Sequence, residues 1–166
     1  MPDVFTKSKR SEVMSLIRSS GNKSTELAMI RVFRGQGITG WRRGRRLRPA
    51  EKRKAESEKG KTETGNLKHG EGRIRIIRPD FVFSQRMIAV FVDGDFWHGH
   101  PTRCRIPATR REWWLAKIGG NKARDRRQNR LLRKNGWKVV RIWQHELEPK
   151  HLSRALRKLR AAGLVA

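Results

Sequence analysis

Two short acidic segments of the sequence have the residue types of a magnesium site. Asp80 stands at the start of an expected strand, and Asp93 and Asp95 follow a continuously apolar strand that ends at Val92. If these strands are neighbours, their aspartates meet at one edge of a sheet, where clustered carboxylates repel unless a hard cation neutralises them. Mg²⁺ takes oxygen ligands, activates water and stabilises charge on a phosphate. Asp-Gly-Asp is also a common turn sequence, so the motif taken alone favours an ordinary turn.

An aromatic and histidine-rich segment, Phe96-Trp97-His98-Gly99-His100, follows the second acidic segment directly. Phe96 and Trp97 would be a liability in an exposed loop, but they can stack on DNA bases or wedge between them. His98 lies within a few residues of the carboxylates. It can take a proton from attacking water or give one to a leaving oxygen, or it can merely support a hydrogen-bond network.

A third group of residues has the chemistry of a zinc site. Zinc accepts all four side chains of Asp95, His100, Cys104 and His145 as ligands, but their spacing matches no short zinc motif. Cys104 alone is more often a small buried apolar residue. Because it is the only cysteine, the chain can form no internal disulfide, which is typical of a reducing cytoplasm.

The charge of the chain predicts a polyanionic partner. There are 41 Lys and Arg against 15 Asp and Glu, a net charge of +26, and each phosphate that a cation neutralises releases a counterion. Arg124, Arg126 and Arg127 lie in an expected basic helix that either contacts phosphates or is a solvated face. Charge carries no chemistry, so charge alone favours a protein that only binds nucleic acid.

The location expected from composition is the cytoplasm, in association with the nucleoid. No apolar run is long enough to span a bilayer, and the basic residues are not gathered on one amphipathic helix, so no membrane partner is expected. The N-terminal segment lacks the apolar region of a secretory signal.

Hydrophobic periodicity predicts an α/β domain in which helices flank a small mixed sheet. Helices are expected at 7–19, 25–34 and 122–134, with another from Thr109 that Gly119-Gly120 ends and a last one carrying Leu152, Ala155, Leu156 and Leu159. Strands are expected around Ile74–Ile77 and at 81–83, 87–92 and 137–143. In this scheme Asn121 caps the helix at 122–134.

Residues 48–71 form a basic stretch with almost no apolar side chains. Such a composition buries too little apolar surface to offset the entropy of ordering, so we expect a flexible insert within a single domain spanning residues 1–166. A clamp that orders on a DNA backbone and a solvated loop are equally compatible with it.

Several segments taken together resemble the very short patch repair (Vsr) endonuclease family. They occur in the family's order and extend along nearly the whole chain except the insert, which makes the combination more specific than any one motif. The segments are Lys9-Arg10-Ser11 with Met14; Glu26; Arg78-Pro79-Asp80-Phe81-Val82; Gly94 with Phe96-Trp97-His98; Pro107-Ala108-Thr109, Trp114, Lys117-Ile118, Asn121 and Arg124-Asp125-Arg126-Arg127; and Leu131, Gly136-Trp137, Val139 and Trp143.

The resemblance implies a restriction-endonuclease-like fold and a Mg²⁺-dependent enzyme that nicks DNA on the 5′ side of a T:G mismatch. Carried over by position, Asp80 would hold Mg²⁺, His98 would be the general acid/base and Glu26 would support the site. The base-stack wedge would be Met14, Phe96 and Trp97. Asn121 and the arginines at 124, 126 and 127 would contact the DNA.

The sequence departs from the family pattern in ways that bear on both metals. Val92-Asp93 stands where the family often has Thr-His, so the Val92 carbonyl and the Asp93 carboxylate become candidate Mg²⁺ ligands. Asp95 and His145 replace zinc cysteines, His100 matches a zinc histidine, and Cys104 is offset. Structural zinc would therefore persist with these ligands, or hydrogen bonds would replace it.

The sequence thus predicts a monomeric Mg²⁺-dependent endonuclease that nicks double-stranded DNA at T:G mismatches. The insert is longer than the family's usual connection, which leaves open a restriction-type or mobile-element nuclease with another target. A non-catalytic, architectural DNA-binding protein is the alternative from a different class.

Overall fold

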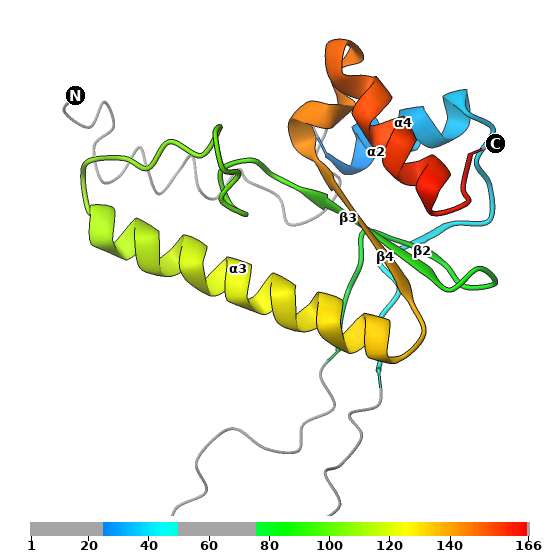
Figure 1. Ribbon diagram of the computed structural model, residues 1–166, viewed down its shortest axis with the longest axis horizontal. Helices are drawn as coiled ribbons and strands as arrows, with labels where there is room; N and C mark the ends of the chain where they lie inside the picture. The colour runs from blue at the N-terminus through cyan, green and yellow to red at the C-terminus, as the bar shows by residue number, and fades with distance from the viewer. Residues whose placement is uncertain (1–24, 50–75, 166) are drawn as a thin grey trace, which may run out of the picture.

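A four-stranded mixed sheet forms the centre of the molecule in the computed structural model, which describes residues 25–49 and 76–165 (Figure 1). The strands lie in the order β1-β2-β3-β4. β1 pairs with β2 and β2 with β3 in antiparallel fashion, whereas β3 and β4 are parallel. Their bounds are Arg42–Arg43, Phe81–Phe83, Ile88–Asp93 and Lys138–Trp143.

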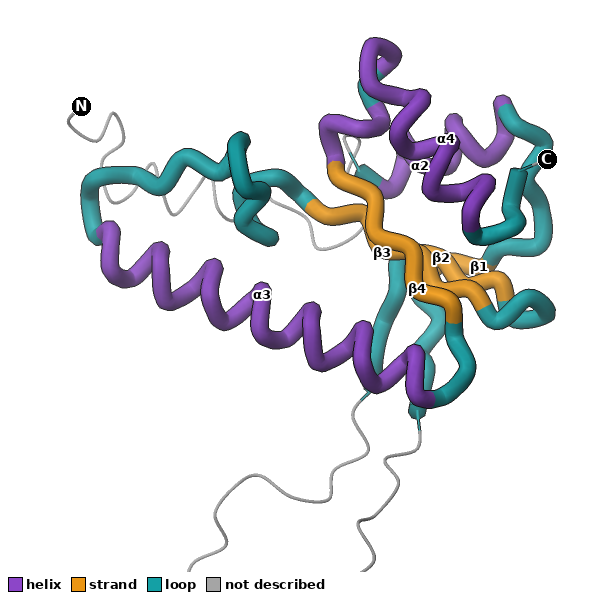
Figure 2. Tube along the Cα trace, viewed as in Figure 1, coloured by secondary structure: helices purple, strands orange, loops and turns teal. Residues whose placement is uncertain are grey.

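Helices cover both faces of this sheet, as the ribbon and tube views show (Figures 1 and 2). On one face lie α2 (Glu26–Gly35) and α4 (Leu152–Ala161), and on the other lies the long α3 (Arg111–Lys134), which makes the crossover between β3 and β4. Two short 3₁₀ turns, η1 (Gln144–Leu147) and η2 (Pro149–His151), join β4 to α4. The predicted α/β class with helices flanking a small mixed sheet is confirmed.

The position of β3 between two layers of helices explains why its sequence is continuously apolar. Successive side chains of a strand point to opposite faces. Val90 and Val92 belong to the hydrophobic cluster with α2 and α4, whereas Ala89 and Phe91 belong to the second cluster with the C-terminal part of α3. With a helix layer on each face, both sets are buried. Asp93 continues the alternation, so it falls on the α3 side.

The predicted helix break at Gly119-Gly120 is wrong, because α3 continues through both glycines for 24 residues. A glycine inside a helix costs only about 0.5–1 kcal/mol relative to alanine. Helix-forming residues on either side and buried contacts at Ile118 and Leu132 offset this cost. Asn121 is therefore a mid-helix residue and does not cap a second helix.

Other differences are small. In the described part of the chain, the strand expected around Ile74–Ile77 is represented by an isolated bridge between Ile77 and Leu47. Met87 belongs to the turn before β3 and has a positive φ of 52°. Helix 7–19, Met14 and nearly all of the 48–71 insert lie outside the described residues, so these expectations and the 1–166 domain bounds remain predictions.

The described ranges contain no helix that is both long and apolar enough to cross a membrane.

Candidate active site

Asp80 lies beside the end of β3 because β2 and β3 are antiparallel. The register pairs Phe81 with Val90, so the residue before β2 meets the last residues of β3. The backbone N–H of Val92 donates a hydrogen bond of 2.7 Å to Asp80 Oδ2. The aspartates of the two strands thus meet at one sheet edge, as expected from the sequence.

The environment of Asp80 disfavours its negative charge. Burial raises its pKa, the Val92 hydrogen bond opposes this, and the charges of Glu26 and Asp93 raise it further, so the pKa changes from 3.8 to about 6. A partly buried carboxylate beside two other acids is typical of a position that a hard cation occupies. The oxygen donors in this part of the site therefore fit Mg²⁺ better than a softer metal.

Glu26 is the first residue of α2 and reaches the same sheet edge. Its carboxylate forms an ion pair with Arg43 of β1, and its side chain is largely buried. α2 packs through its apolar side onto the sheet, which places Glu26 near enough for its charge to act on Asp80.

Asp93, the last residue of β3, is buried and forms a bidentate ion pair with Arg141 of β4. Arg141 Nε donates to Asp93 Oδ2 and Nη2 donates to Oδ1, both at 2.6 Å. The Arg141 guanidinium also stacks over the Phe91 ring, 4.7 Å from its centroid. Arg141 was not anticipated as a site residue. The sequence feature that could have indicated it is a charged residue inside the largely apolar strand WKVVRIW.

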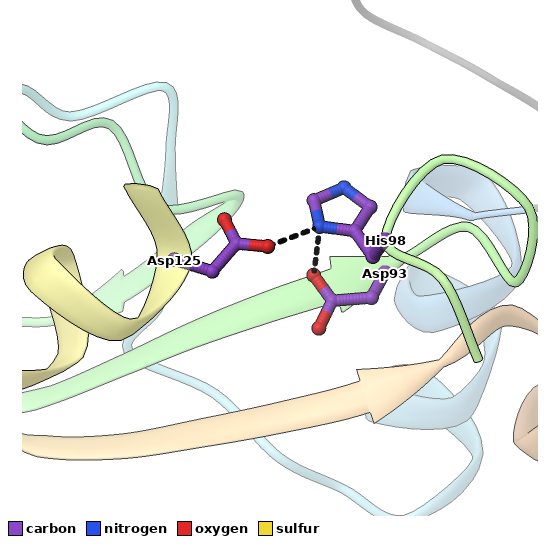
Figure 3. A group of neighbouring side chains, drawn as sticks. All are labelled: Asp93, His98 and Asp125. Atoms are coloured by element: carbon purple, nitrogen blue, oxygen red, sulfur yellow. Dashed lines mark hydrogen bonds and ion pairs between the residues drawn. The ribbon is translucent and has the colours of Figure 1, made fainter. Parts of the chain in front are cut away.

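His98 is oriented by Asp125 of α3 (Figure 3). His98 Nδ1 lies 2.6 Å from Asp125 Oδ2 and 3.4 Å from Asp93 Oδ1. Burial alone would raise the pKa of Asp125, but its hydrogen bond with His98 and the Arg141 charge lower it. Since an ionised carboxylate only accepts, Nδ1 carries the proton, and Nε2 of a neutral ring is left as an acceptor.

Sequence reasoning also missed Asp125 as a site residue, although it lies within a segment that resembles the family. The sequence feature that could have indicated Asp125 is its place as an isolated acidic residue in a strongly basic helix. In the described parts of the chain, Asp93, His98 and Asp125 are the one group of at least three His, Cys, Asp or Glu residues whose candidate ligand atoms all lie within 4.8 Å of one another.

The four residues expected to bind zinc lie in one region but do not form such a group. His145 Nδ1 hydrogen-bonds Asp95 Oδ1 at 2.8 Å, and the His100 ring packs against the His145 ring with centroids 4.7 Å apart. Cys104 Sγ instead donates to the Phe96 carbonyl at 3.4 Å. The donor set does not converge on a common point, and the Asp95–His145 hydrogen bond is the kind expected if zinc is replaced.

The proposed wedge residues are half-buried in an aromatic cluster. Phe96 and Trp97 pack against each other and against Trp114 of α3, with ring centroids 5.1–5.8 Å apart. Asn121 Nδ2 donates to the Trp97 carbonyl at 2.9 Å, so its side chain holds the loop to α3. Trp113, next to this cluster, is half exposed.

The arginines at 124, 126 and 127 are exposed on α3, as a phosphate-contacting surface requires. Arg126 also lines a shallow, open depression along the C-terminal half of the helix. The other residues lining it are Asn129, Arg130, Arg133 and Lys134.

A mixed sheet covered by helices on both faces, with acidic residues and a histidine at one edge, defines a restriction-endonuclease-like α/β fold. The family model described as DNA mismatch endonuclease Vsr matches residues 70–104. The type II nicking enzyme V.NmeAIP of Neisseria meningitidis serogroup A is 33% identical over 155 residues, which is 93% of this chain and 90% of that enzyme. The chain therefore belongs to the DNA mismatch endonuclease Vsr family.

Other relatives match over a shorter segment. The type II nicking enzyme V.NaeI of Lentzea aerocolonigenes is 46% identical over 70 residues, 42% of each chain. The DNA mismatch endonuclease Vsr of Escherichia coli is 46% identical over 68 residues, 40% of this chain and 44% of that protein. These two matches thus span less than half the length of these curated relatives.

Proposed function

We propose that this protein is a Mg²⁺-dependent DNA endonuclease that nicks one strand of a duplex at a T:G mismatch. The observation that carries the proposal is the environment of Asp80, a carboxylate with a raised pKa on which the charge of His98 acts. Asp125 holds Nδ1 of this histidine by a hydrogen bond. The net charge of +26 supports DNA as the substrate. The relative named DNA mismatch endonuclease supports a mismatch as the kind of lesion.

The residues that would hold Mg²⁺ are Asp80 and the carbonyl of Val92, with Asp93 as the further ligand expected from the sequence. Bound there, Mg²⁺ would supply electrostatic stabilisation of the charge that builds on the phosphate and would lower the pKa of water. Glu26 contributes negative charge beside Asp80, while its ion pair with Arg43 keeps that carboxylate in place.

His98 is the proton-transfer residue in this proposal. Asp125 holds Nδ1, which leaves Nε2 to accept a proton from the nucleophile or, once protonated, to donate one to the leaving oxygen. The same Asp125 contact restricts rotation of the ring, so the histidine needs no reorientation before the reaction.

In this proposal the predicted wedge residues distort the DNA, and the predicted arginines of α3 bind its backbone. Met14, Phe96 and Trp97 form the wedge, because apolar side chains that enter a base step unstack and kink the duplex. The arginines at 124, 126 and 127 neutralise phosphates of the DNA backbone. The protein acts on double-stranded DNA as a monomer.

The Asp95–His145 hydrogen bond, in this proposal, takes over the task of a structural zinc ion by tying the loop after β3 to η1. This arrangement keeps Phe96, Trp97 and His98 in register with the sheet edge.

The test is cleavage of end-labelled duplexes with and without Mg²⁺, using a matched duplex and each single mismatch. We expect Mg²⁺-dependent nicking of the T:G duplex that Asp80→Ala abolishes, with Arg157→Met on the exposed side of α4 as a matched control of folding. Cleavage of all duplexes alike would keep the nuclease and reject the mismatch specificity. Tight binding without cleavage under any condition would favour the architectural alternative.

A nuclease with a different target is the second candidate. The basic stretch at 48–71 supports it, because it is longer than the family's usual connection at this place in the chain. Cleavage of a defined matched sequence, with no preference for mismatches, would identify this candidate.

A further inference from the structure

The guanidinium group of Arg141 lies at the centre of a hydrogen-bonded network behind the candidate active site. It donates to both carboxylate oxygens of Asp93, lies 3.2 Å from Asp125 Oδ1 and donates from Nη1 to Asn129 Oδ1 at 3.1 Å. Each of its nitrogens therefore has an oxygen partner within the protein. The planar fork of arginine suits such bidentate contacts, which the point charge of a lysine cannot reproduce.

The sheet geometry explains why these groups meet. β3 and β4 are parallel neighbours, with Phe91 opposite Arg141 and Asp93 opposite Trp143. Asp93 and Arg141 are thus diagonal neighbours on the face toward α3, within reach of each other because arginine is long. Asp125 and Asn129 are one helical turn apart on α3, so both face the same guanidinium.

Arginines pair with three acidic residues of the site and leave one acid, Asp80, without an arginine partner among the described ion pairs. Arg43 pairs with Glu26, and Arg141 pairs with Asp93 and Asp125. Among the described residues, no ion pair involves Asp80. Its nearby charges other than His98 are acidic, those of Glu26 and Asp93. Among the described ion pairs, Asp93 thus has a protein cation as its partner, whereas Asp80 has none.

We propose that Arg141 is a positioning residue that neutralises Asp93 in place of a metal ion and, through Asp125, holds His98 in its reactive orientation. The inference rests on the proposed nuclease function and changes one part of it: Asp93 belongs to the positioning network and does not bind Mg²⁺. Arg141 contacts the protein and not the DNA.

The first test compares Arg141→Met, Arg141→Lys and the control Arg157→Met in cleavage kinetics. For Arg141→Met we expect kcat to fall by about 10- to 100-fold, as for other residues that orient a reactive group from behind. KM for the duplex should stay within about twofold, because the uniform binding of substrate is unchanged. Arg141→Lys should not rescue kcat, since it restores the charge without the bidentate geometry.

The second test asks whether Asp93 binds the metal. Calorimetric titration of Mg²⁺, or of Mn²⁺ as a probe, into Asp93→Asn should give an affinity within about twofold of the wild type. Asp80→Asn should lose binding. The double variant Asp93→Asn/Arg141→Met should lose no more kcat than the worse single variant, because residues that act as one unit are strongly non-additive.

Several results would overturn the inference. These are a raised KM with unchanged kcat in Arg141→Met, full rescue by Arg141→Lys, multiplicative losses in the double variant, or loss of metal binding in Asp93→Asn. If the wild type cleaves no duplex, the nuclease proposal fails separately. Metal titration and the ¹⁵N shift of His98 Nδ1, expected to change in Arg141→Met and not in Arg157→Met, then decide the role of Arg141. Thermal unfolding of each variant identifies any that do not fold.

Discussion

His98 and Asp80 have different electrostatic surroundings, although they lie in one site. Asp125 is ionised and accepts from His98 Nδ1, because its contacts with His98 and Arg141 outweigh burial and lower its pKa. Asp80 has no such cation among the described ion pairs, and its pKa is raised to about 6. One carboxylate thus orients the histidine, and the other is the proposed metal ligand.

The raised pKa of Asp80 predicts that Asp80→Asn stabilises the metal-free protein while abolishing cleavage. Below the unfolded pKa of 3.8 the carboxyl group is neutral in both states. Between 3.8 and about 6 the unfolded state loses its proton before the folded state does, so the wild type loses stability over this range, and the loss is complete above about pH 6. At about pH 8 the variant should unfold with a free energy higher by on the order of 2 to 3 kcal/mol. Denaturant unfolding in a chelating buffer measures this difference.

The pH dependence distinguishes this electrostatic cause from a packing effect. The difference between Asp80→Asn and wild type should shrink towards zero as pH falls to about 4, and a difference independent of pH would contradict the explanation. Mg²⁺ should raise the unfolding temperature of the wild type and leave that of the variant unchanged, because only the former binds it.

At the scale of elements, the loop after β3 is held against α3 by contacts that tolerate little change. Gly99 has a positive φ of 63°, and a Cβ at this position would lie 2.6 Å from Ile118 Cγ2 and would also collide with the Lys122 side chain. Asn121 donates to the Trp97 carbonyl from the same part of the helix. The unbroken course of α3 through Gly119-Gly120 is what aligns these contacts with Asp125.

We therefore expect Gly99→Ala to displace the loop and lower kcat, with a loss of stability of about 1–3 kcal/mol from backbone strain and overpacking. Gly119→Ala is the matched control: no atom lies within 4 Å of its Cβ position, so helix propensity should make it neutral or slightly stabilising. Thermal unfolding and cleavage of both variants measure the contrast. Equal effects of the two substitutions would contradict the proposed docking of the loop.

The Asp95–His145 contact predicts a domain that needs no structural zinc. Purified protein should contain well below one zinc per chain by mass spectrometry, and a chelator should leave its unfolding temperature unchanged. Asp95→Asn should lower stability by about 1–3 kcal/mol, because it weakens a hydrogen bond to a charged group beside the buried His145. Stoichiometric zinc that Asp95→Asn removes would instead establish the Asp95, His100, Cys104 and His145 ligand set.

At the scale of the whole molecule, the net charge of +26 makes DNA binding strongly dependent on salt. Arg126 and Arg127 are exposed on α3, next to the residue that orients His98. If each contacts one phosphate, replacing either with glutamine should reduce the slope of log K against log salt by about 0.9 for every duplex sequence alike. Arg157→Gln on α4, across the sheet from α3, is the control that should leave the slope unchanged (Figure 1).

Fluorescence anisotropy with T:G and matched duplexes at several salt concentrations measures these slopes. An Arg126 or Arg127 variant that weakens binding to one sequence only would indicate base recognition in place of phosphate contact.

The sequence by itself determined the α/β class and most element positions, and it predicted that Asp80 meets Asp93 or Asp95 if their strands are neighbours. These follow from local rules: strand and helix periodicities are short-range, and antiparallel β2 and β3 necessarily bring the start of one strand beside the end of the other. The motif around Phe96, Trp97 and His98 was equally local, and together with the other matching segments it indicated the family.

The tertiary structure alone decided which charge neutralises which. Arg141 and Asp125 come from β4 and α3, far along the chain from Asp93 and His98, and no spacing rule relates them. The continuity of α3 was decided in the same way, because burial of Ile118 and Leu132 outweighs the local cost of two glycines. Pairing and burial are properties of the packed molecule, since they depend on which faces of separate elements come into contact.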